Sequence, residues 1–199
     1  DLFTRSADVQ VKRVVAKKLA RVAEEELHDA ARAEKAYRGC LQLGGDDLEV
    51  LSALDRIYTQ YFEWDRLVEI LEMLAKTVPS DEDRVGYVYR MGNVLETQLG
   101  EQERARIAYH RVVDKLDPRH GESLERLEMI YAEREAWPEL YAIYEKMKEA
   151  TESDAAQADL FAKMGVIAAA CLSDIPRAVG LWKNVWGPNH VGQSHYLRV

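Results

Sequence analysis

Histidine and cysteine are the side chains in this sequence best suited to nucleophilic or metal chemistry, and their spacing supports neither. The histidines show no metal-ligand pattern with Cys40 or Cys171. His190 and His195 lie in a segment expected to be a tail, where they could chelate a metal only adventitiously. Gly44-Gly45 lacks the preceding strand and the following Lys of a phosphate-binding loop, and no nucleophile has an orienting base. We therefore predict no enzyme activity, no metal site and no cofactor.

Composition narrows the classes of protein further. The chain has 199 residues, of which 47% are hydrophobic and 31% charged, with a formal net charge of −8. A broad surface for nucleic acid or anionic membrane would need a basic excess, so neither partner is expected. No apolar run approaches the ~20 residues of a membrane helix, and no signal peptide opens the chain. Two distant cysteines make no disulfide framework, which favours a reduced compartment such as the cytoplasm.

The elements that would position any binding residue are revealed by an internal repeat. The stretch from Leu51 to Val112 returns from Leu124 to Val185 after about 73 residues, which is two units of a roughly 34-residue helix pair. The returning residues include Leu54, Ile57, Tyr58, Trp64 and Leu67, which recur as Leu127, Ile130, Tyr131, Trp137 and Leu140. One helix pair cannot bury its own apolar face, so this period predicts stacked pairs.

The positions of glycine and proline residues, which end helices, indicate the boundaries of the pairs. Breaks at Gly44-Gly45, Pro79, Pro118 and the segment 151–154 separate stretches with helical apolar spacing. The predicted fold is all-α, a solenoid of about five antiparallel helix pairs within one domain over 1–187. The pairs are expected near the following ranges: 7–43, 47–78, 81–116, 120–150 and 154–186. Segment 188–199 is expected to be a tail or the start of a further repeat, and the simplest account is a piece of a longer array.

The first, third and fifth pairs share a small residue inside the first helix. Gly92 and Gly165 would each cost about 1 kcal/mol relative to Ala there, so close backbone packing is the expected reason for them. An aromatic residue in the second helix, such as Tyr109 or Trp182, is expected to fill the gap between successive pairs. Because Trp64 and Trp137 recur at one station of the repeat, we predict core packing for both.

These features resemble tetratricopeptide repeats (TPR), whose pattern runs Leu-Gly, aromatic, Ala, aromatic, Ala and a closing Pro. The second pair matches it through Leu54, Tyr58, Leu67, Leu71, Leu74 and Pro79. The match is divergent, because Asp55 and Glu128 replace the family glycine. The resemblance implies a right-handed superhelix whose concave groove is lined by first helices and holds a peptide or a partner helix.

Carrying the groove positions across by register gives the candidate partner-binding residues. They are Lys17, Arg21, Ser52, Arg56, Gln60, Tyr89, Asn93, Glu96, Glu125, Met129 and Glu133. Guanidinium groups suit a peptide carboxylate, but a solvated helix face with local ion pairs, such as Arg21 with Glu24, is the alternative. Asn93 is suited to holding a peptide backbone with Tyr89 stacked beside it; alternatively, Tyr89 packs between pairs.

The resulting functional hypothesis is a non-catalytic protein-protein interaction scaffold that binds a peptide or partner domain. A second hypothesis is a structural spacer or self-assembling rod, with end-to-end self-association of the chain. A third is an RNA-processing scaffold of the half-TPR type, which the segment from Arg104 to Tyr109 resembles. The acidic balance and the position of the tryptophans at the start of second helices count against the third hypothesis.

Overall fold

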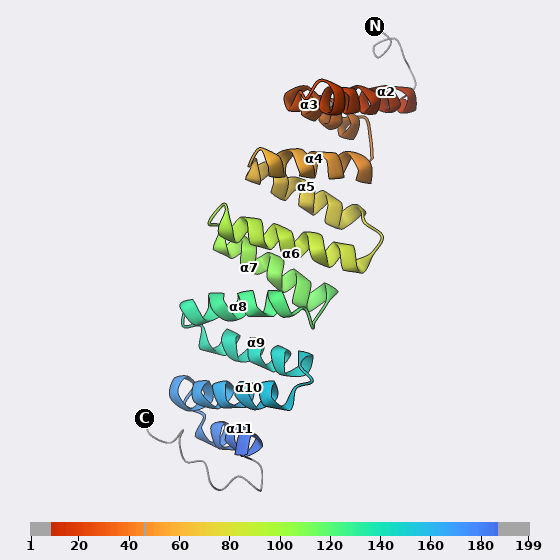
Figure 1. Ribbon diagram of the computed structural model, residues 1–199. Coiled ribbons are helices and arrows are strands. Elements are labelled where there is room, and N and C mark those ends of the chain that lie inside the picture. The colour runs from red at the N-terminus through yellow and green to blue at the C-terminus, as the bar shows by residue number, and fades with distance from the viewer. Residues whose placement is uncertain (1–8, 46, 187–199) are drawn as a thin grey trace. The chain divides into compact units, whose positions relative to one another are not determined.

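The computed structural model describes residues 9–45 and 47–186 (Figure 1). These residues contain helices and no strand, which confirms the all-α prediction for the part of the chain described. The chain divides into two compact units, Asp1–Ala108 (unit 1) and Tyr109–Val199 (unit 2). The predictions of one domain over 1–187 and of a tail or repeat over 188–199 stay predictions, and the second lies outside the described residues.

The helices form the five expected pairs. Pair 1 is α2 (Val9–Arg21) with its terminal turn η1 (Val22–Glu26), and α3 (Ala30–Gln42). The next elements are α4 (Leu48–Gln60) and α5 (Trp64–Thr77) in pair 2, and α6 (Asp81–Thr97) and α7 (Gln102–Arg111) with η2 (Val112–Leu116) in pair 3. Pair 4 is α8 (Gly121–Glu133) and α9 (Trp137–Ala150); pair 5 is α10 (Asp154–Val166), η3 (Ile167–Cys171) and α11 (Ile175–Trp186).

Helices α2 to α6 and helices α8 to α11 pack against their neighbours in the sequence, as Figure 1 shows for the layers of unit 1. In unit 1 the contacts run from α2 to α3, then to α4, α5 and α6, and in unit 2 from α8 to α9, α10 and α11. This nearest-neighbour packing is the property that defines a solenoid.

The core consists of apolar residues that occupy the same stations in successive repeats. Leu54 and Leu127, which the repeat aligns, are both fully buried, as are Leu51 and Leu124. The seam continues through the second helices, where Leu67 and Leu140 are also buried. The repeat in the sequence is therefore a repeat of interior positions.

Trp64 and Trp137 depart in part from the prediction of core packing. Both are half-buried at the first turn of a second helix. The ring of Trp64 lies edge-on to Phe62 with their centroids 5.5 Å apart. A helix start lies at the edge of the stack, so only one side of each indole can reach the core.

Small residues line the contact within the odd pairs. Ala33, Ala105 and Ala178 are fully buried. Of their predicted partners inside the first helices, Ala20 is fully buried, and Gly92 and Gly165 are buried. A Cβ built on Gly165 would lie 2.2 Å from Nε1 of Trp182. Trp182 thus packs against Gly165 of its own pair, whereas the sequence pattern predicted that it would fill the gap between successive pairs.

The chain reverses within every pair through one residue in the left-handed region. These residues are His28 (φ 50°), Phe62 (φ 59°), Gly100 (φ 67°), Glu135 (φ 53°) and Ser173 (φ 57°). The following amide then bonds back into the first helix, as from Glu63 N to Tyr58 O at 2.9 Å. This geometry is the Schellman type of helix end, which satisfies otherwise unpaired carbonyls.

Gly165→Ala is expected to lower the free energy of unfolding by about 1–3 kcal/mol, because the added methyl group overpacks the contact with Trp182. The measurement is urea unfolding followed by circular dichroism. Gly86→Ala in α6 is the matched control, since no atom lies within 4 Å of the added Cβ. The control is expected to raise stability by about 0.5–1 kcal/mol through helix propensity. Equal effects at the two glycines would contradict the packing argument.

Glu135→Gly is expected to raise the free energy of unfolding by about 1 kcal/mol, because glycine adopts the left-handed conformation without steric cost. Ala142→Gly, at an exposed position inside α9, should lower it by about 1 kcal/mol. Thermal and urea unfolding of both variants check the opposite signs. A loss of stability at Glu135 would show that the side chain contributes more than its backbone strain costs.

Candidate protein-interaction surface

The predicted groove residues of unit 1 lie on its first helices, where ion pairs join α2 to α4. Lys17 Nζ lies 2.7 Å from Glu49 Oε2 and 2.8 Å from Asp47 Oδ2, and Arg21 Nη2 lies 2.5 Å from Glu49 Oε1. Burial lowers the pKa of Lys17, but bonds and charge from the two carboxylates outweigh it and raise the pKa overall. The cations predicted to meet a peptide therefore hold neighbouring helices together.

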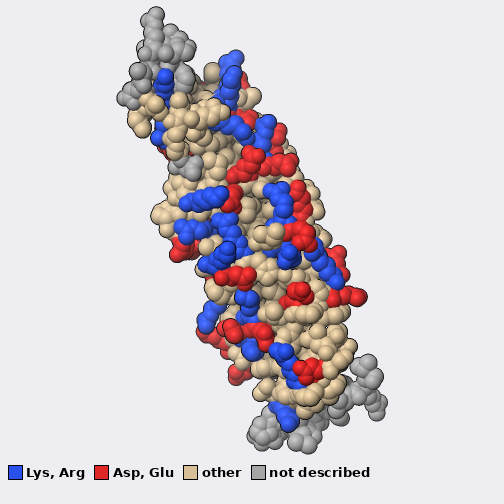
Figure 2. All heavy atoms as spheres, turned by 180° about the vertical axis from the view of Figure 1, so that it is seen from behind, with Lys and Arg blue, Asp and Glu red and all other residues tan. Residues whose placement is uncertain are grey.

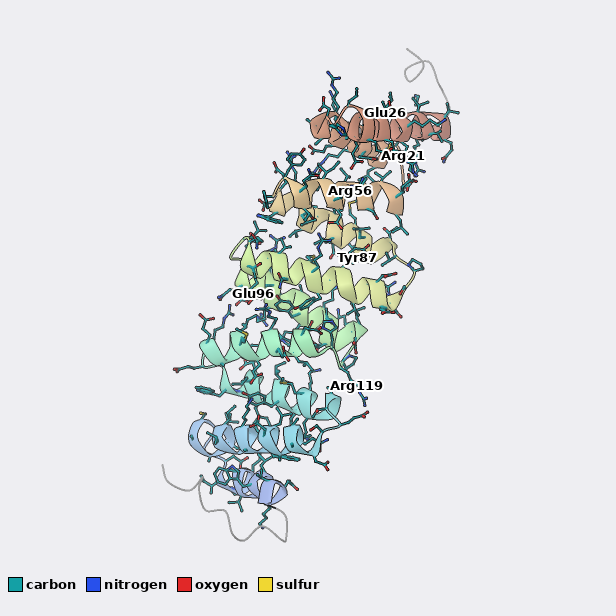
Figure 3. All side chains as sticks on the ribbon, in the orientation of Figure 1. Arg21, Glu26, Arg56, Tyr87, Glu96 and Arg119 are labelled. Atoms are coloured by element: carbon teal, nitrogen blue, oxygen red, sulfur yellow. The ribbon has the colours of Figure 1, made fainter. Side chains whose placement is uncertain are left out.

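Arg56 is engaged in the same way. Its Nη2 lies 2.5 Å from Glu24 Oε1, while Tyr37 donates its hydroxyl to Glu24 Oε2 at 2.9 Å. Figure 3 labels Arg21 on α2 and Arg56 on α4, the two neighbouring first helices of these pairs. The bond to Glu24 raises the pKa of Arg56. Arg21 and Arg56 thus form ion pairs with the adjacent first helix, through Glu49 and Glu24, which differs from the local pair of Arg21 with Glu24 considered as the alternative.

A further ion pair joins α4 to α6. Arg90 donates to Asp55 Oδ2 at 2.7 Å and to Thr59 Oγ1 at 2.7 Å. The repeat places Lys163 and Glu128 at the same two stations in unit 2, and they form an ion pair at 3.4 Å. The acidic residues that replace the family glycine therefore have a structural role in both units.

The remaining predicted residues are distributed over both units. In unit 1, Ser52 and Gln60 are exposed on α4, while Tyr89, Asn93 and Glu96 are half-buried on α6. In unit 2, Glu125, Met129 and Glu133 are exposed on α8. Asn93 accepts a bond on its backbone oxygen from Thr97 Oγ1 at 2.8 Å.

A hollow of about 150 Å³ lies in unit 1, between residues of pairs 1 and 2. Its lining residues are Glu24, His28, Ala30, Ile57, Gln60 and Tyr61. Of these, only Gln60 is in the predicted set. His28 and Tyr61 were missed because they come from the turns between helices, whereas the register carried across by resemblance covers the helices alone.

Tyr61 lines the hollow, and the next residue in the same turn, Phe62, is also aromatic. Tyr61 is 52% exposed, and Phe62, in the left-handed position of the turn, is 71% exposed. The same turn in pair 4 carries Arg134 and Glu135 with a similar backbone. The fold therefore does not need aromatic residues here, and this difference between two copies of the repeat was available in the sequence.

Other features of the described residues restrict the chemistry of the surface. On the face in Figure 2, Lys and Arg side chains are interspersed with Asp and Glu, without a broad patch of one sign. Among the described residues, no group of three His, Cys, Asp or Glu side chains is placed to hold a metal ion. No described helix is long and apolar enough to cross a membrane. Burial raises the pKa of the Cys40 thiol, so this cysteine is a poor nucleophile.

Comparison with known proteins adds structural likenesses alone. No family model matches the chain, and no curated protein matches it. Among solved structures it is similar to YrrB, described as a TPR protein with an unusual peptide-binding site, at 18% identity and a TM-score of 0.46 over 96% of this chain and 94% of that one. The helix pairs are TPR-like.

Two further solved structures resemble the same TPR-like pairs. A MamA structure from AMB-1 has 13% identity and a TM-score of 0.47, covering 93% of this chain and 96% of that one. BtubC from P. vanneervenii has 12% identity and a TM-score of 0.40, with 90% of each chain covered. At these identities and TM-scores, the likenesses say nothing about what this chain binds.

The ion pair between Asp55 and Arg90 is expected to contribute about 1 kcal/mol to stability, since Asp55 is mostly buried. A double-mutant cycle with Asp55→Asn and Arg90→Gln isolates this coupling energy by urea unfolding. The same cycle with Glu128→Gln and Lys163→Gln is the control and should give a smaller coupling, because that pair is longer. Raised salt should reduce both couplings, whereas a coupling near zero for Asp55 and Arg90 would contradict the role assigned to them.

Proposed function

We propose that this protein is a non-catalytic scaffold that binds a peptide or protein partner on the first-helix surface of unit 1. The observation that carries the proposal is exposed Tyr61 in the lining of the hollow, followed in the same turn by exposed Phe62. Large aromatic residues that are exposed in a free protein are typical of the residues that dominate binding energy at interfaces. The partner's identity and its compartment are left open by this proposal.

The electrostatics of the surface support an anchor at the hollow. A peptide carboxylate approaching Arg56 would have to displace Glu24, and one approaching Lys17 would compete with Asp47 and Glu49. Removing a cation from a partly buried pair leaves a carboxylate unpaired, which is costly. We therefore assign Lys17, Arg21 and Arg56 to holding the surface and the hollow to anchoring the partner.

The other predicted residues complete the proposed contact area. Ser52 and Gln60 are exposed on α4 and offer hydrogen-bonding groups, and Gln60 lines the hollow. Tyr89, Asn93 and Glu96 are proposed to extend this area along α6. Glu125, Met129 and Glu133 are proposed as a contact surface on α8 in unit 2, where exposed Met129 supplies an adaptable apolar side chain.

The test exchanges one turn of the repeat for the other. Tyr61→Arg with Phe62→Glu places the sequence of the pair 4 turn into pair 2, so the fold is expected to be retained. Peptides selected from a random library on the immobilised full chain provide the ligand, and calorimetry measures its Kd. The double variant should weaken binding at least about 30-fold, as for loss of a dominant anchor of about 2 kcal/mol.

The matched control is Glu135→Ala at the equivalent turn of pair 4, which should leave the Kd unchanged. Unfolding curves of both variants separate a binding defect from a folding defect. Unchanged affinity in a well-folded double variant would reject the hollow as the anchor. Selection of no peptide that binds the full chain above background would count against the scaffold proposal itself.

A further inference from the structure

The outer face of α2 is unlike that of the other first helices in the odd pairs. Shifts within the repeat align Leu19 of α2 with Met91 of α6 and with Met164 of α10. Met91 is 9% exposed and Met164 is buried, whereas Leu19 is 57% exposed. Val22 is 41% exposed, although its counterpart Val94 is 7% exposed. The apolar side chains at these repeat positions are therefore buried in α6 and α10, whereas Leu19 and Val22 are exposed to solvent.

The packing order shows what covers the stations elsewhere. Within their own pairs, α2 packs against α3 and α10 packs against α11. What α6 and α10 have in addition is a preceding even pair, through α5 in unit 1 and α9 in unit 2. Among the described residues, α2 has no such neighbour. The preceding even pair is thus the neighbour that α6 and α10 share and that α2 lacks among the described residues.

The charge on this face of α2 is also complementary to an even pair. Lys18 of α2 aligns with Arg90 and Lys163, which pair with Asp55 and Glu128 on the preceding even pair. Lys18 is exposed and forms no ion pair with a described residue. The face thus combines open apolar stations with a cation at the position that elsewhere receives a carboxylate.

We infer that the face formed by Lys18 and Leu19 of α2 and by Val22 of η1 is a docking surface for a further helix pair of the even type. That pair carries a carboxylate at the station of Asp55 and Glu128. A second copy of this chain fits less well, because pair 5 has Gly165 at the station where a carboxylate is needed.

A graft of this chain's own even pair tests the surface. Residues 47–80 are joined directly to Val9, which reproduces the spacing from α5 to α6. Hydrogen exchange of the α2 amides is compared with that of the unmodified chain. The graft is expected to slow exchange about tenfold or more, because docking raises the local opening free energy.

Charge reversal separates this docking from a general effect of added chain. Lys18→Glu in the graft should speed exchange of the α2 amides about fivefold relative to the unmutated graft. Adding Asp55→Lys in the grafted copy should restore the slower rate. Lys35→Glu on α3, an exposed lysine without an ion pair to a described residue, is the matched control and should change nothing. Equal protection in all the charge variants, or no protection in the graft, would overturn the inference.

Two further measurements address the other occupants of this face. A chain that begins at Val9 should show the same α2 exchange as the unmodified chain, and faster exchange would identify residues 1–8 as the cover instead. Sedimentation over a range of concentrations should show the same mass for the unmodified chain and for Leu19→Asp. A dimer that Leu19→Asp dissociates would identify a second copy as the occupant and overturn the inference.

Discussion

The structure depends above all on the burial of apolar side chains between successive helices. A fully buried leucine contributes about 1.5–3 kcal/mol, whereas an exposed ion pair contributes about 0–1 kcal/mol. Leu54, Leu67 and Leu71 alone thus outweigh the ion pairs that join α2 to α4. The apolar seam makes the stack stable. The charged pairs add specificity, because they match particular helices of the odd and even pairs.

This division of roles explains why the repeat is a double unit. Odd pairs have a small residue in the first helix, as at Gly165, which lets the second helix approach closely. Even pairs carry Asp55 or Glu128 there, and this carboxylate binds a cation on the next odd pair. The charges of the two kinds of pair are therefore complementary when an even pair is followed by an odd pair. An end of such an array is specific for its neighbour, because burial and charge must both be satisfied.

The turns contribute a different kind of information. Their backbone is nearly constant, with one left-handed residue in every pair, while the side chain at that position varies from glycine to phenylalanine. A strained, exposed Phe62 where another copy carries Glu135 is hard to explain by folding. Comparison between copies of a repeat thus separates residues that the fold requires from residues available for binding, without any second protein.

The sequence by itself determined the all-α class, the pairing of helices and the interior stations, because Leu54 and Leu127 recur at a period that only stacked pairs can bury. It also placed the turns and the small residues of the odd pairs. Only the tertiary structure decided what the charged residues do. Arg56 and Lys17 looked like ligand-binding groups until Glu24 and Glu49, about thirty residues away in sequence, proved to lie against them. Helical periodicity specifies which face of a helix a residue occupies, but the partner across that face depends on packing between helices, and so does the hollow beside Tyr61.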